Sequence, residues 1–385
     1  MDATTAPAPV PAPLPEGRPR VAVVFGGRSG EHGISCATAG GVLAAIDRER
    51  YDVVPVGITR TGRWVLVEDE PERWRITDGR LPEVTDAHGA EVLLPRSTED
   101  TELTVVRAGA VPSVLGRVDV VLPLLHGPYG EDGTLQGMLD LAGVRYVGAG
   151  VLASAVGMDK HYMKLVLAGQ GIPVAPYTVL RPGAWERDPA PWTAAVEALG
   201  LPVFVKPARA GSSLGISRVD DLADLPAAVA AAQEHDPKVL VEAGVQGREV
   251  ECAVLGGRDG AQPRTSLPGE IVVLDPEHAF YDFEAKYLDE DGVALSCPAD
   301  LPQDVIERVR DLAARTFEAI GCEGLARVDT FVTEGGDVVV NEINTMPGFT
   351  PYSMYPRMWE ATGLAYPDLI DELLQLALAR GTGLR

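Results

Sequence analysis

The chain has 385 residues, of which 46% are hydrophobic, and a formal net charge of −23. This length predicts two or three domains, and the composition is typical of a soluble α/β enzyme. The negative charge argues against a nucleic-acid backbone or an anionic membrane surface as partner, although a local group of lysines is enough to hold ATP. No apolar run approaches the roughly 18 residues that span a bilayer, so no membrane partner is expected.

Residues 1–19 are rich in Pro and Ala and lack both the basic region and the apolar region of a secretory signal. We expect this segment to be a disordered tail. The four cysteines are scattered, without a metal-binding spacing. Reduced thiols and a cytoplasmic location are therefore expected.

Residues 20–150 are predicted to form an open α/β domain. The apolar strand 21–25 leads into the glycine-rich turn 26–35 and then into a helix. This is the opening unit of a sheet whose functional loops lie at the carboxyl ends of its strands. A second buried strand, 118–125, has the same context, whereas residues 61–117 look like a peripheral insertion.

Residues 151–238 are predicted to form a central α+β domain. The apolar strand 201–206 ends on Lys206 and is followed by the glycine- and serine-rich loop 207–215. A β-branched segment, 216–219, then returns as a strand. Strand, loop, strand and helix in this order suit a mobile loop that covers phosphate groups.

Residues 239–385 are predicted to contain a β-hairpin with strands at 325–333 and 338–344. If Gly335 and Gly336 form its loop, Asp329 lies opposite Glu342 and Arg327 lies opposite Asn344. Alternation then places these four side chains on one face.

Two carboxylates that face each other across a hairpin repel and would destabilise it. The pair Asp329 and Glu342 makes sense if a divalent cation lies between them, because Mg²⁺ is often held by one or two carboxylates and by phosphate oxygens. The alternative is a solvated hairpin whose charges avoid each other.

Two short motifs are typical of other enzymes, but the residues around each motif do not support that assignment. The G-x-G-x-x-A pattern at 148–153 has no acidic residue about twenty positions later, as a dinucleotide site requires. The G-x-S-x-G pattern at 211–215 is followed by a strand-like segment, whereas a nucleophile elbow needs a helix directly after the serine. No Walker-type phosphate loop occurs in the sequence.

Seven stretches of residues 20–378 together resemble the D-alanine–D-alanine ligase family of the ATP-grasp superfamily. They are V-F-G-G-R-S-G-E-H-G-I-S, L-L-H-G-P-Y-G-E-D-G-T-L-Q-G, M-D-K, V-K-P-A-R-A-G-S-S-L-G, F-Y-D-F-E-A-K-Y, A-R-V-D and N-E-I-N-T-M-P-G-F-T-P-Y-S. Their correct order makes the resemblance highly specific. It implies a three-domain ATP-grasp architecture of α/β and α+β parts, with an N-terminal open α/β (pre-ATP-grasp) domain.

The resemblance also implies the reaction. ATP phosphorylates the carboxylate of one D-alanine, and the amine of a second D-alanine displaces the phosphate to form D-alanyl-D-alanine for peptidoglycan synthesis. The expected cofactors are ATP and two Mg²⁺ ions, with Mn²⁺ as a substitute, and the expected assembly is a homodimer.

Several roles carry over from the matching positions. The metal ligands are Asp329, Glu342 and Asn344. The ATP contacts are Lys160, Lys206, Ser212, Glu242, Ala243, Val245, Glu249, Lys286, Asn341 and Glu342. The catalytic residues are Glu31, Ser212, Tyr287, Arg327 and Gly348. The substrate contacts are Glu31, His126, Arg327, Gly348, Ser353 and Met354. Ala243 departs from the lysine often found in the family, which removes a side-chain contact to adenine.

Three alternatives remain open at this point, and one of them is another ATP-grasp ligase that joins a different carboxylate and amine. A ligase that uses D-lactate or D-serine as second substrate would share these motifs, although Tyr287 is typical of dipeptide synthesis. An ATP-binding protein without activity would have a broken metal or oxyanion set. Here Arg327, Asp329, Glu342 and Asn344 are all present.

Overall fold

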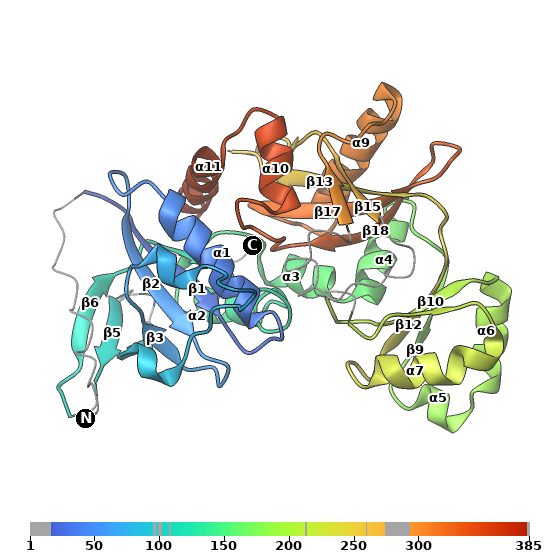
Figure 1. Cartoon of the computed structure of the whole chain (residues 1–385), viewed down its shortest axis with the longest axis horizontal. Coiled ribbons are helices and arrows are strands. Elements are labelled where there is room, and N and C mark those ends of the chain that lie inside the picture. Colours follow the sequence, from blue (N-terminus) through green and yellow to red (C-terminus); the bar gives the residue numbers. More distant parts are fainter. Residues whose placement is uncertain are drawn as a thin grey trace.

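The computed structural model describes residues 17–94, 98, 102–107, 109–211, 214–258, 260–273 and 293–382 (Figure 1). Its strands form an eight-stranded, a four-stranded and a six-stranded sheet. The eight-stranded sheet lies at one end of the molecule and the four-stranded sheet at the other, with the six-stranded sheet between them (Figure 1). This confirms a mixed α/β and α+β architecture.

The eight-stranded sheet has the order β6-β5-β4-β3-β2-β1-β7-β8. Its parallel part confirms the predicted open α/β unit and consists of β2 (Asp52–Ile58), β1 (Arg20–Gly26), β7 (Val120–Pro123) and β8 (Arg145–Tyr146). The fully buried run Val21–Phe25 is the centre of β1. The glycine turn that follows β1 leads into α1 (His32–Ala45), and the loop after β7 leads into α2 (Thr134–Leu141).

The interpretation of residues 61–117 as a peripheral insertion is wrong. This segment supplies the antiparallel half of the sheet, formed by β3 (Trp64–Leu66), β4 (Glu91–Leu93), β5 (Glu102–Val106) and β6 (Ser113–Arg117). Val65, Val92 and Leu103 of these strands are buried, the first in one core and the other two in a second core. These strands are short and separated by polar turns with the one-turn helices η1 (Pro71–Trp74) and η2 (Asp86–His88), so their hydrophobic pattern is weak.

Two helices connect this sheet to the rest of the chain, α3 (Val151–Met158) and α4 (Lys160–Gly169). Asp159 separates them and caps α4, because its carboxylate accepts hydrogen bonds from the N–H groups of His161 and Tyr162. The buried face of α4 consists of Lys160, Met163, Lys164 and Leu167. Two lysines therefore occupy the stripe that an amphipathic helix normally fills with apolar residues.

The four-stranded sheet has the order β11-β10-β12-β9. Its strands are β9 (Tyr177–Leu180), β10 (Val203–Pro207), β11 (Ser217–Val219) and β12 (Val239–Ala243). The accompanying helices are α5 (Ala184–Arg187), α6 (Ala190–Leu199), η3 (Leu222–Asp224) and α7 (Leu225–Gln233). Because β12 pairs with β10 and β9, the predicted division after residue 238 cuts through this sheet.

The six-stranded sheet has the order β16-β15-β13-β17-β18, with β14 paired to β13. Its strands are β13 (Arg248–Leu255), β14 (Arg264–Thr265), β15 (Gly269–Val273), β16 (Val293–Ser296), β17 (Leu325–Val332) and β18 (Val338–Asn344). The helix α9 (Gln303–Ala319) packs on this sheet, and its buried Val309 and Phe317 share a core with the inner faces of β13, β17 and β18.

The C-terminal helices return to the N-terminal sheet. They are α10 (Met354–Ala361) and α11 (Tyr366–Ala379). Leu369 and Leu373 of α11 belong to the same core as Val21 and Phe25 of β1. No helix in the described part of the chain combines the length and the apolar character needed to cross a bilayer.

The hairpin β17–β18 has the predicted residue pairs far from its turn, but the register near the turn differs from the prediction. Asp329 pairs with Glu342 and Arg327 with Asn344, as expected. Nearer the turn, however, Thr330 pairs with Val340, so Asn341 is an extra residue in a β-bulge. The turn is therefore not the predicted two-residue loop: the N–H of Thr333 donates to the Asp337 carbonyl at 2.9 Å. The bulge shifts the register by one residue.

Candidate active site

A cavity of about 500 Å³ lies between the glycine loops of the N-terminal sheet and the hairpin β17–β18. Many of the predicted site residues line its wall, namely Glu31, His126, Lys160, Arg327, Glu342, Asn344, Gly348, Ser353 and Met354. The structure thus brings together side chains that are more than 300 positions apart in sequence. Ser212, Lys286 and Tyr287, which were also predicted, lie outside the described residues.

Glu31 stands at the start of α1, where the helix N-terminus favours a negative charge. Gly127 makes room for it, since a Cβ atom there would lie 2.3 Å from Glu31 Oε2. Gly127 also has a φ of 72°, a conformation that favours glycine. The two glycine loops of the N-terminal sheet therefore meet at the Glu31 carboxylate.

His126 and Glu131 hold the peptide of Met346, which lies two residues before Gly348. The His126 Nδ1 is 3.1 Å from the Met346 carbonyl oxygen, and Glu131 Oε2 accepts from the Met346 N–H at 3.3 Å. Burial lowers the pKa of His126 to about 4, so the ring is neutral and its Nδ1–H donates. Burial and nearby Glu31 raise the pKa of Glu131 to about 8, although the hydrogen bond from the Gly127 N–H lowers it.

Arg327 lies at the centre of a carboxylate cluster on the hairpin. Its guanidinium donates two hydrogen bonds of 2.7 Å to the Asp329 carboxylate, and its Nε is 3.2 Å from Glu251 Oε1. Asn344 Nδ2 donates to Asp329 at 2.9 Å. Burial disfavours the charged guanidinium, but Asp329 and Glu251 together raise the pKa of Arg327 well above its ordinary value. Arg327 is thus a fixed cation on the wall of the cavity.

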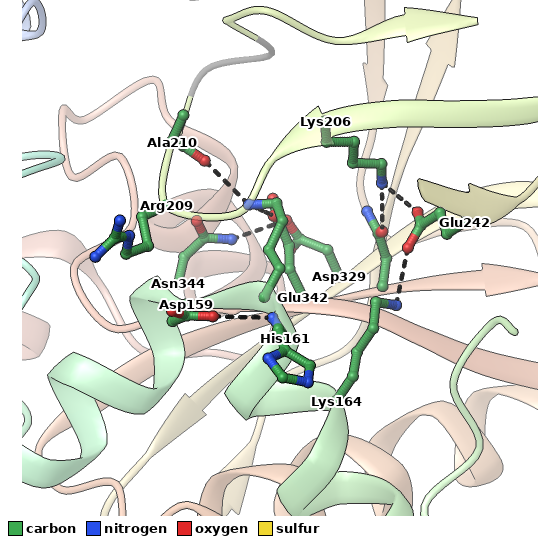
Figure 2. A network of polar contacts seen from close by, with 12 residues as sticks. Asp159, His161, Lys164, Lys206, Arg209, Ala210, Glu242, Asp329, Glu342 and Asn344 are labelled. Atoms are coloured by element: carbon green, nitrogen blue, oxygen red, sulfur yellow. Dashed lines mark hydrogen bonds and ion pairs between the residues drawn. The ribbon is translucent and has the colours of Figure 1, made fainter. Parts of the chain in front are cut away.

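Lys160 contacts the other carboxylate of the hairpin. Its Nζ lies 2.8 Å from Glu342 Oε2 and donates to the carbonyl of Ala210 at 3.0 Å, as Figure 2 shows for the labelled partners. Burial alone would raise the pKa of Glu342, but the charge of Lys160 outweighs it and holds the pKa at about 2. Lys160 thereby connects the hairpin to the start of the serine loop.

The donor set fits a divalent cation that is shared with a nucleotide. In the described residues, no three His, Cys, Asp or Glu side chains gather closely enough to form a metal centre alone. Asp329 and Glu342 supply two carboxylates and Asn344 an amide oxygen, which suits Mg²⁺ completed by phosphate oxygens. The repulsion between the two carboxylates is already offset by Arg327 and Lys160, so the hairpin does not require a metal for its stability.

A second charged cluster lies beside the cavity, where β10, β12 and α4 meet (Figure 2). Glu242 of β12 is in contact with Lys206 of β10 through Oε1 and with Lys164 of α4 through Oε2, the latter at 3.0 Å. Burial raises the pKa of Glu242, but Lys206 and then Lys164 lower it to about 2. Lys206 Nζ also lies 3.5 Å from Asn341 Oδ1 in the hairpin bulge.

The remaining predicted ATP contacts lie on β12, on β13 and in the connection between these strands. Ala243 is the last residue of β12, and Val245 lies in the short connection to β13. The Ala243 N–H donates to the Pro176 carbonyl at 2.9 Å. Glu249 is an exposed residue of β13 opposite Phe331. These three residues do not line the 500 Å³ cavity, so the predicted adenine contacts lie apart from the predicted substrate contacts.

Ser353 and Met354 lie where α10 begins at the cavity wall. The Ser353 hydroxyl oxygen accepts from the Thr350 N–H at 3.1 Å and lies 2.7 Å from the Thr350 hydroxyl. It does not cap α10, whose first turn contains no acidic residue. The positive end of this helix therefore faces the cavity and favours an anion.

Sequence analysis missed three charged residues beside the predicted site: Glu131, Lys164 and Glu251. Glu131 was present in a quoted motif but was given no role. Lys164 follows Lys160 by four residues, so both lie on one helix face, and this spacing was a usable signal. Glu251 was given no role, and nothing in the sequence indicated its pairing with Arg327.

Family models match most of the chain. The model described as D-ala D-ala ligase N-terminus matches residues 20–149, and the model described as D-ala D-ala ligase C-terminus matches residues 166–375. The chain is 64% identical over 376 residues to a D-alanine–D-alanine ligase from Kineococcus radiotolerans, covering 96% of this chain and 99% of that protein. It is 59% identical over 368 residues to one from Arthrobacter sp. (strain FB24), covering 96% of each.

Solved structures of D-alanine ligases also resemble this chain, at lower sequence identity. The VanG D-Ala:D-Ser ligase from Enterococcus faecalis superposes with a TM-score of 0.79 and 33% identity, covering 94% of this chain and 100% of that one. The D-alanine–D-alanine ligase from Coxiella burnetii has a TM-score of 0.74 and 34% identity, covering 94% of both chains.

Proposed function

This chain belongs to the D-alanine–D-alanine ligase family, and we propose that the 500 Å³ cavity is its active site. The chain is an ATP-dependent carbon–nitrogen ligase that joins two D-alanine molecules for peptidoglycan synthesis. The observation that carries the site assignment is the convergence of Glu31, Arg327, Glu342 and Gly348 on one cavity wall. Glu31 can pair with an ammonium group and Arg327 with an anion. Glu342 can bind a metal ion, and Gly348 offers its backbone N–H as a donor.

In the first step, a carboxylate oxygen of one D-alanine attacks the terminal phosphorus of ATP, and ADP leaves. Glu31 holds the ammonium of this D-alanine by charge. Lys160 and Lys206 hold the phosphate groups, after exchanging the carboxylates they contact here for phosphate oxygens. These residues supply mainly position and charge, as phosphoryl transfer requires.

In the second step, the amine of the other D-alanine attacks the carbonyl carbon of the acyl phosphate. The carbon–oxygen bond to phosphate then breaks, and the departing phosphate takes the proton that the amine loses. Arg327 and the Gly348 N–H stabilise the negative oxygen that forms in between. His126 and Glu131 act through Met346, because their hydrogen bonds set the position of the loop that carries Gly348. The first turn of α10 and Ser353 receive the carboxylate of the second D-alanine.

Asp329, Glu342 and Asn344 would hold two Mg²⁺ ions, for which Mn²⁺ is a substitute. When bound, the metal offsets negative charge on the phosphate oxygens during transfer. Glu242, Val245 and Glu249, with the backbone at Ala243, form the adenine and ribose side, and Asn341 lies between them and the metal ligands. Ser212, Lys286 and Tyr287 complete the proposed set from outside the described residues.

We also propose a cytoplasmic homodimer with the predicted three-domain division, its second boundary moved beyond Ala243. Exposed apolar side chains on α2 and α3 support a dimer, namely Leu141, Val151 and Leu152. The four free cysteines support a reducing compartment. Sedimentation of the purified chain would measure its assembly.

The deciding experiment measures phosphate release from Mg²⁺-ATP with D-alanine alone and identifies the product by mass. We expect D-alanyl-D-alanine, and we expect Glu342→Gln to lose most of this activity. Parallel reactions with D-alanine plus D-serine or D-lactate test the acceptor. Product only in those reactions would contradict dipeptide synthesis.

D-serine is the second candidate acceptor. It is favoured only by the likeness to the VanG D-Ala:D-Ser ligase at 33% identity. The relatives at 59% and 64% identity are D-alanine–D-alanine ligases, which supports D-alanine as the acceptor.

A further inference from the structure

Lys164 is a buried cation to which the proposed mechanism assigns no role. Its side chain is 1% exposed, and it does not line the cavity. It lies on the buried face of α4 between Lys160 and Leu167. A buried lysine is destabilising unless it is paired, so its position requires an explanation.

The partner of Lys164 is Glu242, which already has a second cation. Lys164 Nζ lies 3.0 Å from Glu242 Oε2, while Lys206 contacts the other oxygen, Oε1. One carboxylate thus faces two lysines, and with both protonated the cluster carries one positive charge more than neutrality requires. Burial lowers the pKa of Lys164, the charge of Glu242 opposes this, and nearby Lys206 lowers it further. All three side chains are less than 10% exposed, so solvent screens this excess charge poorly.

The two lysines differ in what else they can reach. Lys206 Nζ is 3.5 Å from Asn341 Oδ1, which precedes the proposed metal ligand Glu342, so it faces the phosphate side. Lys164 extends from the buried helix face, and its Nζ lies 5.9 Å from the centroid of the Tyr177 ring. Lys206 can therefore change partner, whereas Lys164 stays beside Glu242.

We propose that Lys164 is a positioning residue of the nucleotide site, which keeps Glu242 charged and in place when Lys206 turns to the phosphates of ATP. This inference rests on the proposed function, since it assumes that Lys206 and Glu242 contact the nucleotide. Without Lys164, binding of ATP would leave Glu242 buried without a cation. The unpaired charge would then weaken the binding of ATP but not the binding of D-alanine.

The test compares wild type with Lys164→Met in steady-state assays that vary ATP and D-alanine separately. We expect the KM for ATP to rise about tenfold or more, with kcat and the KM for D-alanine within about twofold of wild type. Calorimetric titration with Mg²⁺-ATP should show the same loss. Lys164→Gln, which keeps a donor but not the charge, should give a smaller rise and serves if the Met variant does not fold.

A double-mutant cycle and a matched control variant distinguish a positioning role of Lys164 from a purely structural one. In a Glu242→Gln background, Lys164→Met should change the KM for ATP by less than about twofold, because no carboxylate remains to be held. Lys238→Met removes another buried ion pair, in which Lys238 Nζ lies 2.7 Å from Asp159 Oδ1. It should lower the melting temperature without the same selective change in the KM for ATP.

An unchanged KM for ATP in both Lys164 variants would overturn the inference, as would an equal effect in the Glu242→Gln background. Absence of D-alanine-dependent phosphate release from the wild-type protein would instead overturn the proposed function. The two failures are therefore distinguishable in one set of assays.

Discussion

The two charged clusters of this molecule neutralise their carboxylates in different ways. On the hairpin, Asp329 is paired with Arg327 and Glu342 with Lys160, and the Glu342 side chain is 26% exposed. In the buried cluster, Glu242 is 4% exposed and has both Lys164 and Lys206 as partners. A carboxylate with one partner near a cavity can exchange it for a metal ion. A buried carboxylate with two partners can release one and remain paired.

A third carboxylate shows what happens without a cation. Within the described part of the chain, Glu131 forms no ion pair with Lys or Arg, and its pKa rises to about 8. The pKa values of Glu242 and Glu342 are both held at about 2 by their lysines. Glu131 differs from the other two in that it has no lysine partner, and the negative charge of Glu31 adds to the effect of burial. The following predictions test this contrast, beginning with the largest effect.

Replacing Arg327 by Met should lower kcat by about a thousandfold, because the fixed cation that stabilises the oxyanion is lost. Single-turnover phosphate release would measure the loss, and circular dichroism would verify folding. Arg327→Lys keeps the charge but cannot make both hydrogen bonds to Asp329, so it should recover only part of the rate. A kcat within threefold of wild type for Arg327→Met would exclude this role.

The two carboxylates with lysine partners should differ in which ligand they control. Glu342→Gln should lower kcat about a hundredfold and raise the Mg²⁺ concentration required for half activity. Glu242→Gln should instead raise the KM for ATP about tenfold, with little change in the Mg²⁺ requirement. Thermal shifts on adding ADP with and without Mg²⁺ provide a second readout that does not depend on turnover. Identical Mg²⁺ titrations for both variants would contradict the contrast.

Glu131 should make the protein less stable as the pH rises. Its pKa is about 8 in the folded state and is near 4.5 when unfolded, so the folded state binds more protons between these values. Its stabilising contribution is complete below about pH 4.5 and is lost as the pH passes 8. Relative to Glu131→Gln, the wild type should lose on the order of a few kcal/mol of unfolding free energy from pH 5 to 8.

Urea unfolding of both proteins at each pH measures this difference. Subtracting the variant removes other groups, including His126, whose lowered pKa gives the opposite slope between about pH 4 and 6.5. If the unfolding free energies of wild type and Glu131→Gln change with pH in parallel, the fold does not raise the pKa of Glu131.

The sequence predicted the hairpin cluster better than the buried cluster, and the reason is physical. Asp329 and Glu342 lie on adjacent strands joined by a short turn, so local alternation places them on one face. Lys164, Lys206 and Glu242 come from a helix and two strands, and only tertiary packing brings them together. Sequence patterns also do not show a β-bulge: the partners of Asp329 were predicted correctly, but the extra residue Asn341 was not.

The same distinction applies to the fold. Continuous apolar runs such as Val21–Phe25 identified the buried parallel strands, because both faces of such strands are covered. The short strands β3 to β6 were not recognised as half of a sheet, since each has too few residues to display a pattern. Position in a sheet is also non-local. β12 begins at residue 239 but pairs with β9 and β10, which a linear division of the chain could not show.

The smallest predicted effect tests whether the two clusters are coupled through Asn341. Its Oδ1 lies 3.5 Å from Lys206 Nζ, at the limit of a hydrogen bond, and Glu342 is the next residue. Asn341→Ala should therefore raise the KM for ATP by about two- to threefold, with little change in stability. Asn341→Asp adds a charge that would hold Lys206 on the hairpin, so it should weaken ATP binding more than Ala does. If Ala and Asp have equal effects on the KM for ATP, the bulge serves only to set the register of Glu342, and the clusters act independently.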